Sequence, residues 1–255
     1  MTDTVARAAE VLKRAEQILV FSGAGLSTES GIPDFRGPDG LWTKVDPDDF
    51  TIERWMSRRD IRSRGWKMHL DGELWGARST VEPNNGHVAI VRLREAGRLA
   101  GVVTQNVDGL HHKSGLEDDF VAEMHGNVRY SHCLSCDGRW PTETVLKWIE
   151  AGDDDPHCPR CAGMVKTDTI LFGEALPEDE VRKASVFLTI SDAVLVVGST
   201  VSVWPAADVV QRAAIQGKPV VIVNRGETDA DHIASVRIDA DIGDVLPDLV
   251  DLILN

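Results

Sequence analysis

Short apolar runs alternate along the chain with stretches whose apolar positions recur at helical spacing. Runs at residues 18–21, 100–104, 193–198 and 220–224 lack polar alternation and are typical of parallel strands buried on both faces. Residues 4–16, 86–96 and 205–216 have the pattern of amphipathic helices. This order of elements predicts an α/β fold with a doubly wound parallel sheet in a Rossmann-like domain.

Two segments do not fit this alternation. Residues 38–83 hold four tryptophans among many charged residues, which predicts short helices forming a cap, with most of the tryptophans in its core. Residues 128–167 separate strands of one sheet and hold all the cysteines, so they are predicted to be an insertion. The predicted division places residues 1–37, 84–127 and 168–255 in the Rossmann-like domain, residues 38–83 in the helical cap and residues 128–167 in a small cysteine module.

Acidic side chains outnumber basic ones. The chain has 255 residues, with 41 Asp and Glu against 27 Lys and Arg, and a formal net charge of −14 at pH 7. Proteins that bind nucleic acids gain much of their affinity by neutralising phosphates, so no nucleic acid partner is expected. Such a charge suits Lys-rich polypeptides as partners, although it also serves solubility alone. The charge leaves the oligomeric state open.

No stretch approaches the roughly 20 apolar residues that a membrane helix needs, so no membrane partner is expected. Residues 1–16 alternate apolar and charged side chains and lack the apolar core of a signal peptide. All four cysteines lie in close pairs. Together these features predict a protein of the reducing cytoplasm.

Four cysteines form two C-x₂-C pairs. Cys133 and Cys136 make the first pair, Cys158 and Cys161 make the second, and 21 residues separate the pairs. This spacing is close to that of a tetrahedral Cys₄ zinc site, in which four thiolates leave no open position for a substrate. The sequence therefore predicts one structural zinc ion. The alternative is a pair of disulfides, which a cytoplasmic location disfavours.

A glycine-rich turn follows the first predicted strand. Gly23, Ala24 and Gly25 begin it, and the next glycine is Gly31, so the match to G-x-G-x-x-G is imperfect. Such a turn brings backbone N–H groups close to a pyrophosphate, but a plain turn explains it equally well. Residues 32–37 then place an acid, an aromatic ring and a guanidinium beside it, unlike a hydride-transferring Rossmann domain. These three residues are Asp34, Phe35 and Arg36.

Polar side chains follow the second predicted strand. Gln105, Asn106 and Asp108 come directly after residues 100–104, at the strand end where ligands meet doubly wound sheets. His125 lies shortly before the first cysteine pair and is a candidate general base, because its unperturbed pKa is near 6.5. The alternative for an isolated histidine is a purely structural role.

Taken together, these segments resemble the sirtuins, the NAD-dependent protein lysine deacylases. The resemblance spans roughly residues 8–249. The segments that carry it, in chain order, are residues 23–36, residues 104–108, His125 with Gly126, the four cysteines, Phe172 with Gly173 and Glu174, residues 198–205, and Val223 with Asn224.

The resemblance implies an NAD site in the Rossmann-like domain. Gly23, Ala24 and Gly25 would receive the pyrophosphate, with Gly198, Ser199 and Thr200 adjoining. Asn224 would contact the adenosine ribose, and the backbone near Asp241 and Ile242 the adenine. Gln105 would hold the nicotinamide ribose, Asn106 and Asp108 would line the nicotinamide pocket, and Phe35, flanked by Asp34 and Arg36, would shield the sugar.

The resemblance also implies a reaction. An acyl-lysine oxygen attacks C1′ of the nicotinamide ribose and expels nicotinamide, and His125 then acts as the base on a ribose hydroxyl. The products are free lysine and 2′-O-acyl-ADP-ribose, with Asn106 as a second catalytic residue and zinc remote. The acyl-lysine protein would bind as a strand between Phe172, Gly173 and Glu174 on one side and Val201 and Val203 on the other.

Other functions stay open as alternatives. A protein mono-ADP-ribosyltransferase would use the same NAD site, and His125 argues against it because only deacylation needs this base. A non-catalytic NAD-binding sensor would not need Asn106, Asp108 and His125 together. An oxidoreductase would give neither the modified loop nor the zinc module a role.

One departure from the family bears on the acyl group. Desuccinylating sirtuins carry a tyrosine and an arginine three residues apart after the glycine loop. Here residues 38–83 contain no tyrosine, because Tyr130 is the only one in the chain. Arg54, Arg58 and Arg59 are expected on a solvated helix face. Neutral acyl groups are therefore the expected substrates.

Overall fold

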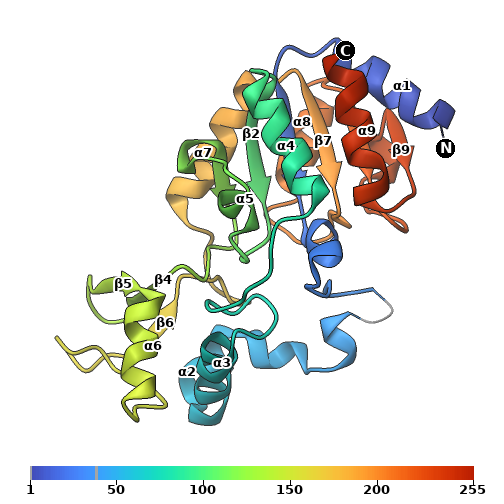
Figure 1. Ribbon diagram of the computed structural model, residues 1–255. Coiled ribbons are helices and arrows are strands. Elements are labelled where there is room, and N and C mark those ends of the chain that lie inside the picture. Colours follow the sequence, from blue (N-terminus) through green and yellow to red (C-terminus); the bar gives the residue numbers. More distant parts are fainter. Residues whose placement is uncertain (1, 38–39) are drawn as a thin grey trace.

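A parallel sheet of six strands forms the centre of the protein (Figure 1). The computed structural model describes residues 2–37 and 40–255; Met1, Asp39 and Pro38, at which the predicted cap begins, lie outside the described residues. The strand order β3-β2-β1-β7-β8-β9 is that of dinucleotide-binding sheets. The strands are β1 (Ile18–Ser22), β2 (Leu99–Thr104), β3 (Val121–Glu123), β7 (Ala193–Val197), β8 (Val220–Val223) and β9 (Val236–Ile238).

Helices cover both faces of this sheet, which confirms the predicted doubly wound fold (Figure 1). Every residue of β1, β2, β7 and β8 is buried. Their side chains belong to two hydrophobic clusters, one on each face of the sheet, which hold the helices against it. On one face lie α1 (Thr2–Lys13), α4 (Asn85–Glu95) and α9 (Ile242–Leu254). On the other lie α7 (Glu178–Ile190) and α8 (Asp208–Ile215). The two termini lie close together at one end of the molecule (Figure 1).

Some predicted boundaries were wrong. The helix expected at residues 4–16 ends at Lys13, because a turn in which Ala15 N–H donates to Leu12 leads into β1. The helix expected at residues 205–216 begins only at Asp208, after a turn in which Asp208 N–H donates to the Pro205 carbonyl. The sheet also has two edge strands that were not predicted, β3 and β9. Each is three residues long, too short to show a periodicity.

A second, antiparallel sheet lies away from the first, in the cysteine segment (Figure 1). Its order is β5-β4-β6, and one helix packs on it. The elements are β4 (Tyr130–Cys133), β5 (Arg139–Pro141), α6 (Thr142–Glu150) and β6 (Val165–Thr167). The short helices α5 (Leu110–Lys113), η4 (Asp118–Phe120) and η5 (Asp231–Ile233) complete the connections around the large sheet.

Short helices fill the described part of the predicted cap. They are η2 (Leu41–Thr43), η3 (Pro47–Phe50), α2 (Ile52–Ser57) and α3 (Arg59–Asp71). Trp55, Trp66 and Trp75 are buried, as expected. Trp66, however, joins the hydrophobic cluster of the cysteine module, together with Cys133 and Cys158. The cap and the cysteine module therefore share a core.

A buried ion pair fastens the cap to the cysteine module. Arg62 Nε and Nη2 donate to the two carboxylate oxygens of Asp155 at 2.7 and 2.8 Å. Arg62 Nη1 also donates to the carbonyls of Trp55 and Met56 at 3.0 Å. The side chains of Arg62 and Asp155 are 9% and 8% exposed.

Among the helices of residues 2–37 and 40–255, none is long and apolar enough to cross a membrane.

We expect Arg62→Met to destabilise the protein strongly, by about 3 kcal/mol or more, because it leaves the carboxylate of Asp155 buried without its partner. Chemical denaturation would measure the free energy of unfolding. The control is Arg58→Met, since Arg58 pairs with Asp60 and both side chains are mostly exposed, at 53% and 61%. Equal losses in the two variants would show that the buried pair has no special structural role.

Candidate active site

The loops after β1 and β7 meet backbone to backbone. These strands are neighbours at the point where the strand order reverses, which is where ligands bind in doubly wound sheets. Gly25 N–H donates to the carbonyl of Gly198 at 2.9 Å. A Cβ added at Gly23 would lie 2.7 Å from that oxygen, so a larger residue does not fit. The close contact between the two backbones therefore explains why glycines occupy positions 23 and 25, and a bound ligand would be a second reason.

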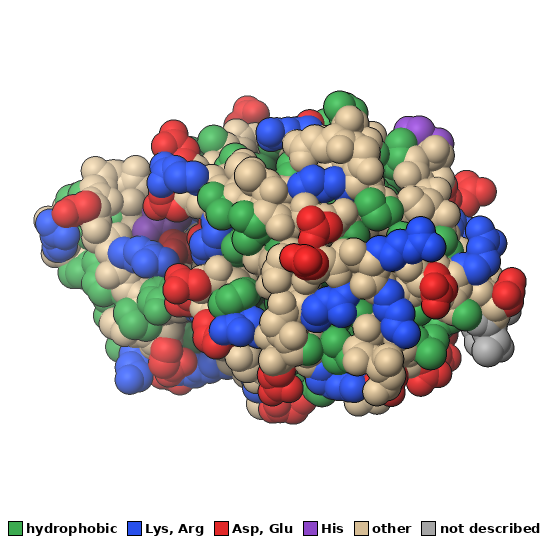
Figure 2. Space-filling view, turned by 90° about the horizontal axis from the view of Figure 1, so that it is seen from above, with side chains coloured by type: hydrophobic (Ala, Val, Ile, Leu, Met, Phe, Trp, Pro, Cys, Tyr) green, Lys and Arg blue, Asp and Glu red, His purple; other side chains and the backbone are tan. Residues whose placement is uncertain are grey.

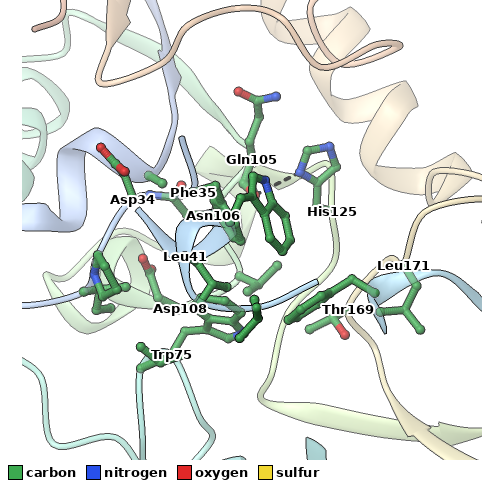
Figure 3. A pocket seen from close by; sticks show the side chains of 18 of the residues that line it. Asp34, Phe35, Leu41, Trp75, Gln105, Asn106, Asp108, His125, Thr169 and Leu171 are labelled. Carbon is green, nitrogen blue, oxygen red and sulfur yellow. Dashed lines mark hydrogen bonds between the residues drawn. The ribbon is translucent and has the colours of Figure 1, made fainter. Parts of the chain in front are cut away.

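A cavity of about 1330 Å³ opens beside these loops. Residues predicted for the cofactor come together on its wall, as do most of those predicted for the peptide (Figure 3). The predicted residues that line it are Gly23, Ala24, Gly25, Asp34, Phe35, Arg36, Gln105, Asn106, Asp108, His125, Phe172, Gly173, Glu174, Gly198, Ser199, Thr200, Val203 and Asn224.

Two predicted site residues do not line the cavity. Val201 is 1% exposed, and its N–H donates to Ser199 Oγ at 3.1 Å, which turns it into the core behind the wall. Ile242 begins α9 and is 5% exposed. Its side chain lies against Gly198, where an added Cβ would come within 2.8 Å of it. Both side chains therefore support the site from behind.

His125 has one ring nitrogen fixed and the other unengaged. Nδ1 lies 3.0 Å from the carbonyl oxygen of Gln105, to which it donates, as drawn in Figure 3. No hydrogen bond to Nε2 is present within residues 2–37 and 40–255, and the ring lines the cavity. Burial lowers the pKa of His125 below its usual value near 6.5. The ring is therefore neutral at pH 7, with a lone pair available on Nε2.

The backbone around His125 is tightly constrained. The carbonyl of His125 accepts a hydrogen bond from Ile170 N–H at 2.8 Å. Gly126 follows with a φ of +69°, and an added Cβ there would lie 1.8 Å from the carbonyl oxygen of Asp168. Glycine is thus required after His125, because the chain at residues 168–170 packs directly on it.

A buried hydrogen-bond network joins the polar cluster to the glycine loop. Asn106 Nδ2 donates to the Gly23 carbonyl at 3.1 Å and lies 3.2 Å from Ser27 Oγ. Ser27 Oγ donates to Asp108 Oδ2 at 2.7 Å. Burial raises the pKa of the Asp108 carboxyl group, although Leu110 N–H and Ser27 oppose this shift. The network holds an amide and a carboxyl group at the end of β2, beside the loop that follows β1.

Gln105 and Phe35 are also held in place. Ser199 Oγ donates to Gln105 Oε1 at 2.8 Å, so this amide bridges the loops after β2 and β7. The ring of Phe35 packs between Trp42 and Trp75, with centroid distances of 5.1 and 5.2 Å. Phe35 therefore has the support of an aromatic cluster that covers one side of the cavity.

The loop at residues 168–174 rests on a buried lysine that sequence reasoning missed. Lys166 is 2% exposed, and its ammonium group donates to the Thr167 and Thr169 carbonyls and pairs with Glu174 Oε2 at 3.1 Å. Burial lowers the pKa of Lys166, and Glu174 opposes this shift. Lys166 lines the cavity. No signal in the sequence marks it, because a lysine on a short edge strand is normally exposed.

Phe172 connects this loop to the cap. Its N–H donates to the Phe50 carbonyl at 2.9 Å, and its carbonyl accepts from Ile52 N–H at 3.0 Å. Phe172 is 47% exposed and lines the cavity. The backbone of Phe172 is thus already paired with the cap, which leaves its side chain to face a ligand.

The four cysteines come together in the small module, as predicted. Their sulfur atoms all lie within 4.8 Å of one another. Cys133 Sγ is 3.5 Å from Cys161 Sγ, and Cys136 Sγ is 3.7 Å from Cys158 Sγ. Zinc–sulfur bonds of about 2.3 Å in a tetrahedron place the sulfurs about 3.8 Å apart, so the group fits one zinc ion. The cysteines are free thiols, which excludes the disulfide alternative in this structure.

The profile of the Sir2 family matches residues 23–205 of this chain. An NAD-dependent protein deacetylase of Rhodopseudomonas palustris is 37% identical to it over 246 residues, which make up 96% of this chain and 96% of that protein.

Solved structures of Sir2 enzymes have the same fold. One, determined to study the mechanism and regulation of these enzymes, matches with a TM-score of 0.88 and 36% identity, over 99% of this chain and 98% of that chain. Another is a Sir2 variant with a deacetylated p53 peptide and 3′-O-acetyl-ADP-ribose, at a TM-score of 0.85 and 32% identity, over 96% of both chains.

Replacing Cys161 by serine should cost both zinc and stability. An incomplete sulfur shell loses the part of the folding energy that metal binding supplies, and we expect a fall in Tm of roughly 5–10 °C. Elemental mass spectrometry would measure zinc per chain, and calorimetry the Tm. Arg160→Ala is the matched control, because Arg160 lies within the same C-x₂-C pair, its side chain is 60% exposed, and the change keeps all four thiols. A Cys161→Ser variant that retains its zinc or its Tm would contradict the structural role.

Proposed function

This chain belongs to the Sir2 family and is an NAD-dependent protein lysine deacetylase, and we propose that the cavity beside His125 is where it acts. One observation carries the proposal. A neutral histidine, fixed at Nδ1 and unengaged at Nε2, lines the same cavity as the glycine loop and Phe172. A general base, a dinucleotide-binding turn and a peptide-facing loop thus share one space.

The walls of the cavity fit NAD. The loops at residues 23–25 and 198–200 would hold the pyrophosphate, and Asn224, at the end of β8, would contact the adenosine ribose. Backbone at Asp241 and Ile242 would meet the adenine. When bound, NAD supplies the ADP-ribosyl group that accepts the acyl group as nicotinamide leaves.

The residues around the nicotinamide half would act by position and by exclusion of water. Gln105 would hold the ribose, since Ser199 already orients its amide. Asn106 and Asp108, tied together through Ser27, would line the nicotinamide pocket. Phe35 would cover the sugar from the aromatic side, with Asp34 and Arg36 beside it. Developing positive charge on the sugar needs shielding from water, and no nucleophilic side chain is required.

His125 would then take a proton at Nε2 from a ribose hydroxyl. The hydrogen bond from Nδ1 to the Gln105 carbonyl selects the tautomer that leaves Nε2 as the acceptor. The same carbonyl would stabilise the imidazolium that forms. Because burial lowers the pKa of His125, the base is in its active form at neutral pH.

The acyl-lysine protein would enter between the loop at residues 172–174 and Val203. We propose a peptide in an extended conformation, paired by backbone hydrogen bonds, so that little of its sequence is read. Phe172 offers its ring to the peptide, and Val201 contributes from the core behind. A net charge of −14 suits proteins rich in lysine.

We also propose the division of the chain into a Rossmann-like NAD-binding domain (1–37, 84–127 and 168–255), a helical cap (38–83) and a zinc module (128–167). A cytoplasmic location is proposed because a Cys₄ zinc site is favoured where thiols stay reduced. Nucleic acids are not proposed as partners, on the basis of the net charge. On the face seen in Figure 2, basic and acidic side chains are interspersed.

Mixing the protein with NAD and an acetyl-lysine peptide should release nicotinamide only when the peptide is present, and should yield 2′-O-acetyl-ADP-ribose. His125→Ala should lower kcat/KM by at least about 100-fold, because the base is lost. Mass spectrometry of the products measures both. His232→Ala, which removes an exposed histidine of η5, is the control.

The pH dependence should reflect the lowered pKa of His125. Because protonation inactivates the base, the wild-type kcat/KM should fall only when the pH drops through this pKa, which lies below the usual 6.5. A pH titration of kcat/KM measures it.

Three outcomes would contradict this assignment. NAD consumption that attaches ADP-ribose to protein would favour the transferase. NAD binding without turnover would favour the sensor. Near-normal activity of His125→Ala, with calorimetry showing intact NAD binding, would remove this residue from the mechanism.

Deacetylation should exceed desuccinylation by at least about tenfold in kcat/KM, or roughly 1.4 kcal/mol, because burying an unpaired carboxylate is costly. The three arginines that follow the glycine loop in the cap, Arg54, Arg58 and Arg59, are engaged at the surface, and none of them lines the cavity. Arg54 is held by Asp46 and Asp49, Arg58 by Asp60 and Arg59 by Asp154. Acetyl- and succinyl-lysine peptides of one sequence would decide it, and equal rates would show that a cation does reach the acyl group.

A further inference from the structure

A tight turn at the end of β3 carries His125. Glu123 is the last residue of the strand, and Gly126 N–H donates to the Glu123 carbonyl at 2.9 Å. His125 is therefore the third residue of a four-residue turn. The hydrogen bond from Nδ1 to Gln105 fixes the tautomer of the ring, but the position of the ring also depends on the backbone of this turn.

A buried side-chain hydrogen bond spans the same turn. Asn127 Nδ2 donates to Glu123 Oε2 at 2.8 Å, and the two residues are 8% and 6% exposed. They stand two positions before and two positions after His125, so their bond closes a ring around the turn. Neither Glu123 nor Asn127 lines the cavity. Any effect of this pair on the reaction must therefore pass through the turn.

The amide of Asn127 has one orientation that satisfies its neighbours. Its Oδ1 accepts from Arg129 N–H at 3.0 Å and from Tyr130 N–H at 3.3 Å. If the amide were reversed, its NH₂ group would face two donors and its oxygen would face a carboxylate. The backbone that follows the turn thus directs Nδ2 toward Glu123.

The carboxylate of Glu123 is held from its other side by Arg129. Arg129 Nη2 donates to Glu123 Oε2 at 2.8 Å, which pairs the buried charge. The stem of Arg129 lies over Gly109, where an added Cβ would come within 3.7 Å of it. The pair is therefore braced against the segment that follows Asp108, on the nicotinamide side of the proposed site.

The second oxygen of Glu123 faces a histidine. Glu123 Oε1 lies 3.5 Å from His112 Nδ1, and His112 Nε2 lies 2.9 Å from an oxygen of Asp118. Burial lowers the pKa of His112 to about 4, so the ring is neutral at pH 7. With the ring proton on Nε2, donated to Asp118, the lone pair of Nδ1 faces Glu123.

We propose that Glu123 and Asn127, named the His125 clamp, are positioning residues for deacetylation. The inference rests on the proposed function, because it takes His125 to be the base. A general base must lie within roughly 2.6–3.2 Å of the group whose proton it takes, and a displacement of about 1 Å costs on the order of 100-fold in rate. The clamp holds the turn at the place from which Nε2 reaches the ribose hydroxyl.

Two rates separate the steps before and after His125 acts. Nicotinamide leaves first in the proposed mechanism, so labelled nicotinamide returns to the sugar and enters NAD without His125. Free lysine forms only after His125 has taken its proton. With NAD and an acetyl-lysine peptide, Glu123→Ala and Asn127→Ala should each lower the kcat of deacetylation at least about tenfold. The rate of nicotinamide exchange and the KM for NAD should change less than about threefold, and mass spectrometry measures both products.

Glu123→Gln is the conservative variant. Its amide oxygen accepts from Asn127 and Arg129, and its NH₂ group donates to the lone pair of His112 Nδ1. It should therefore restore the kcat of deacetylation to within about threefold of the wild-type value. Glu117→Ala is the control for the loss of a carboxylate, because Glu117 is 59% exposed and pairs with Arg94 at 3.4 Å.

Equal losses of exchange and deacetylation in the alanine variants would overturn the clamp, because they would indicate a general loss of structure. Near-normal deacetylation by both alanine variants, or a loss in Glu123→Gln as large as in Glu123→Ala, would also overturn it. If Glu123→Ala does not fold, Asn127→Ala decides, since it leaves the pair of Glu123 and Arg129 in place. A wild-type protein that neither exchanges nicotinamide nor releases free lysine would instead overturn the proposed function, and this inference with it.

Discussion

The contact between the loops after β1 and β7 is the constraint on which the rest of the site depends. Parallel strands at the centre of a doubly wound sheet bring their carboxyl ends together, and here the two backbones touch through the Gly25–Gly198 hydrogen bond. Gly198 has a φ of +61°, and an added Cβ would lie 2.2 Å from the Leu26 nitrogen. Once these loops are fixed, Ser27 and Ser199 orient Asn106 and Gln105, and the Gln105 carbonyl orients His125.

A second constraint comes from the loop at residues 168–174, which bonds to the His125 backbone, to the cap and to the cysteine module. Its Ile170 bonds the His125 backbone, and its Phe172 bonds the cap. Lys166, from the sheet of the cysteine module, ties the loop together from below through Glu174. A buried lysine is unfavourable unless its donors are satisfied, and here three oxygens satisfy them. The loop is thus shaped by polar contacts with fixed geometry, which suits a surface that aligns a peptide.

The sequence predicted the sheet and the zinc site well because both leave local signals. Apolar runs reveal doubly buried strands, and C-x₂-C spacing reveals a metal site. Edge strands β3 and β9 left no such signal, because three residues are too few to show a hydrophobic periodicity. The positions of Ile242 and Val201 could be recognised, but the directions of their side chains could not. Ile242 packs against Gly198, and Val201 is turned by its hydrogen bond to Ser199. No sequence pattern encodes these contacts. Lys166 was missed for the same reason, because its burial is set by tertiary contacts.

The cysteine cluster and the cavity are connected, because the helix α3 contacts both of them. Trp66 packs with Cys133 and Cys158, and Arg62 binds Asp155, three residues before Cys158. Gly65 and Met68 line the cavity from the same helix. Because one helix contacts both parts, the folding energy that a bound zinc ion would supply to the cysteine module would also help to hold the cap against the active site. A zinc ion held by the four cysteines would therefore stabilise the cavity wall through α3, and its closed sulfur shell would leave it no part in the chemistry.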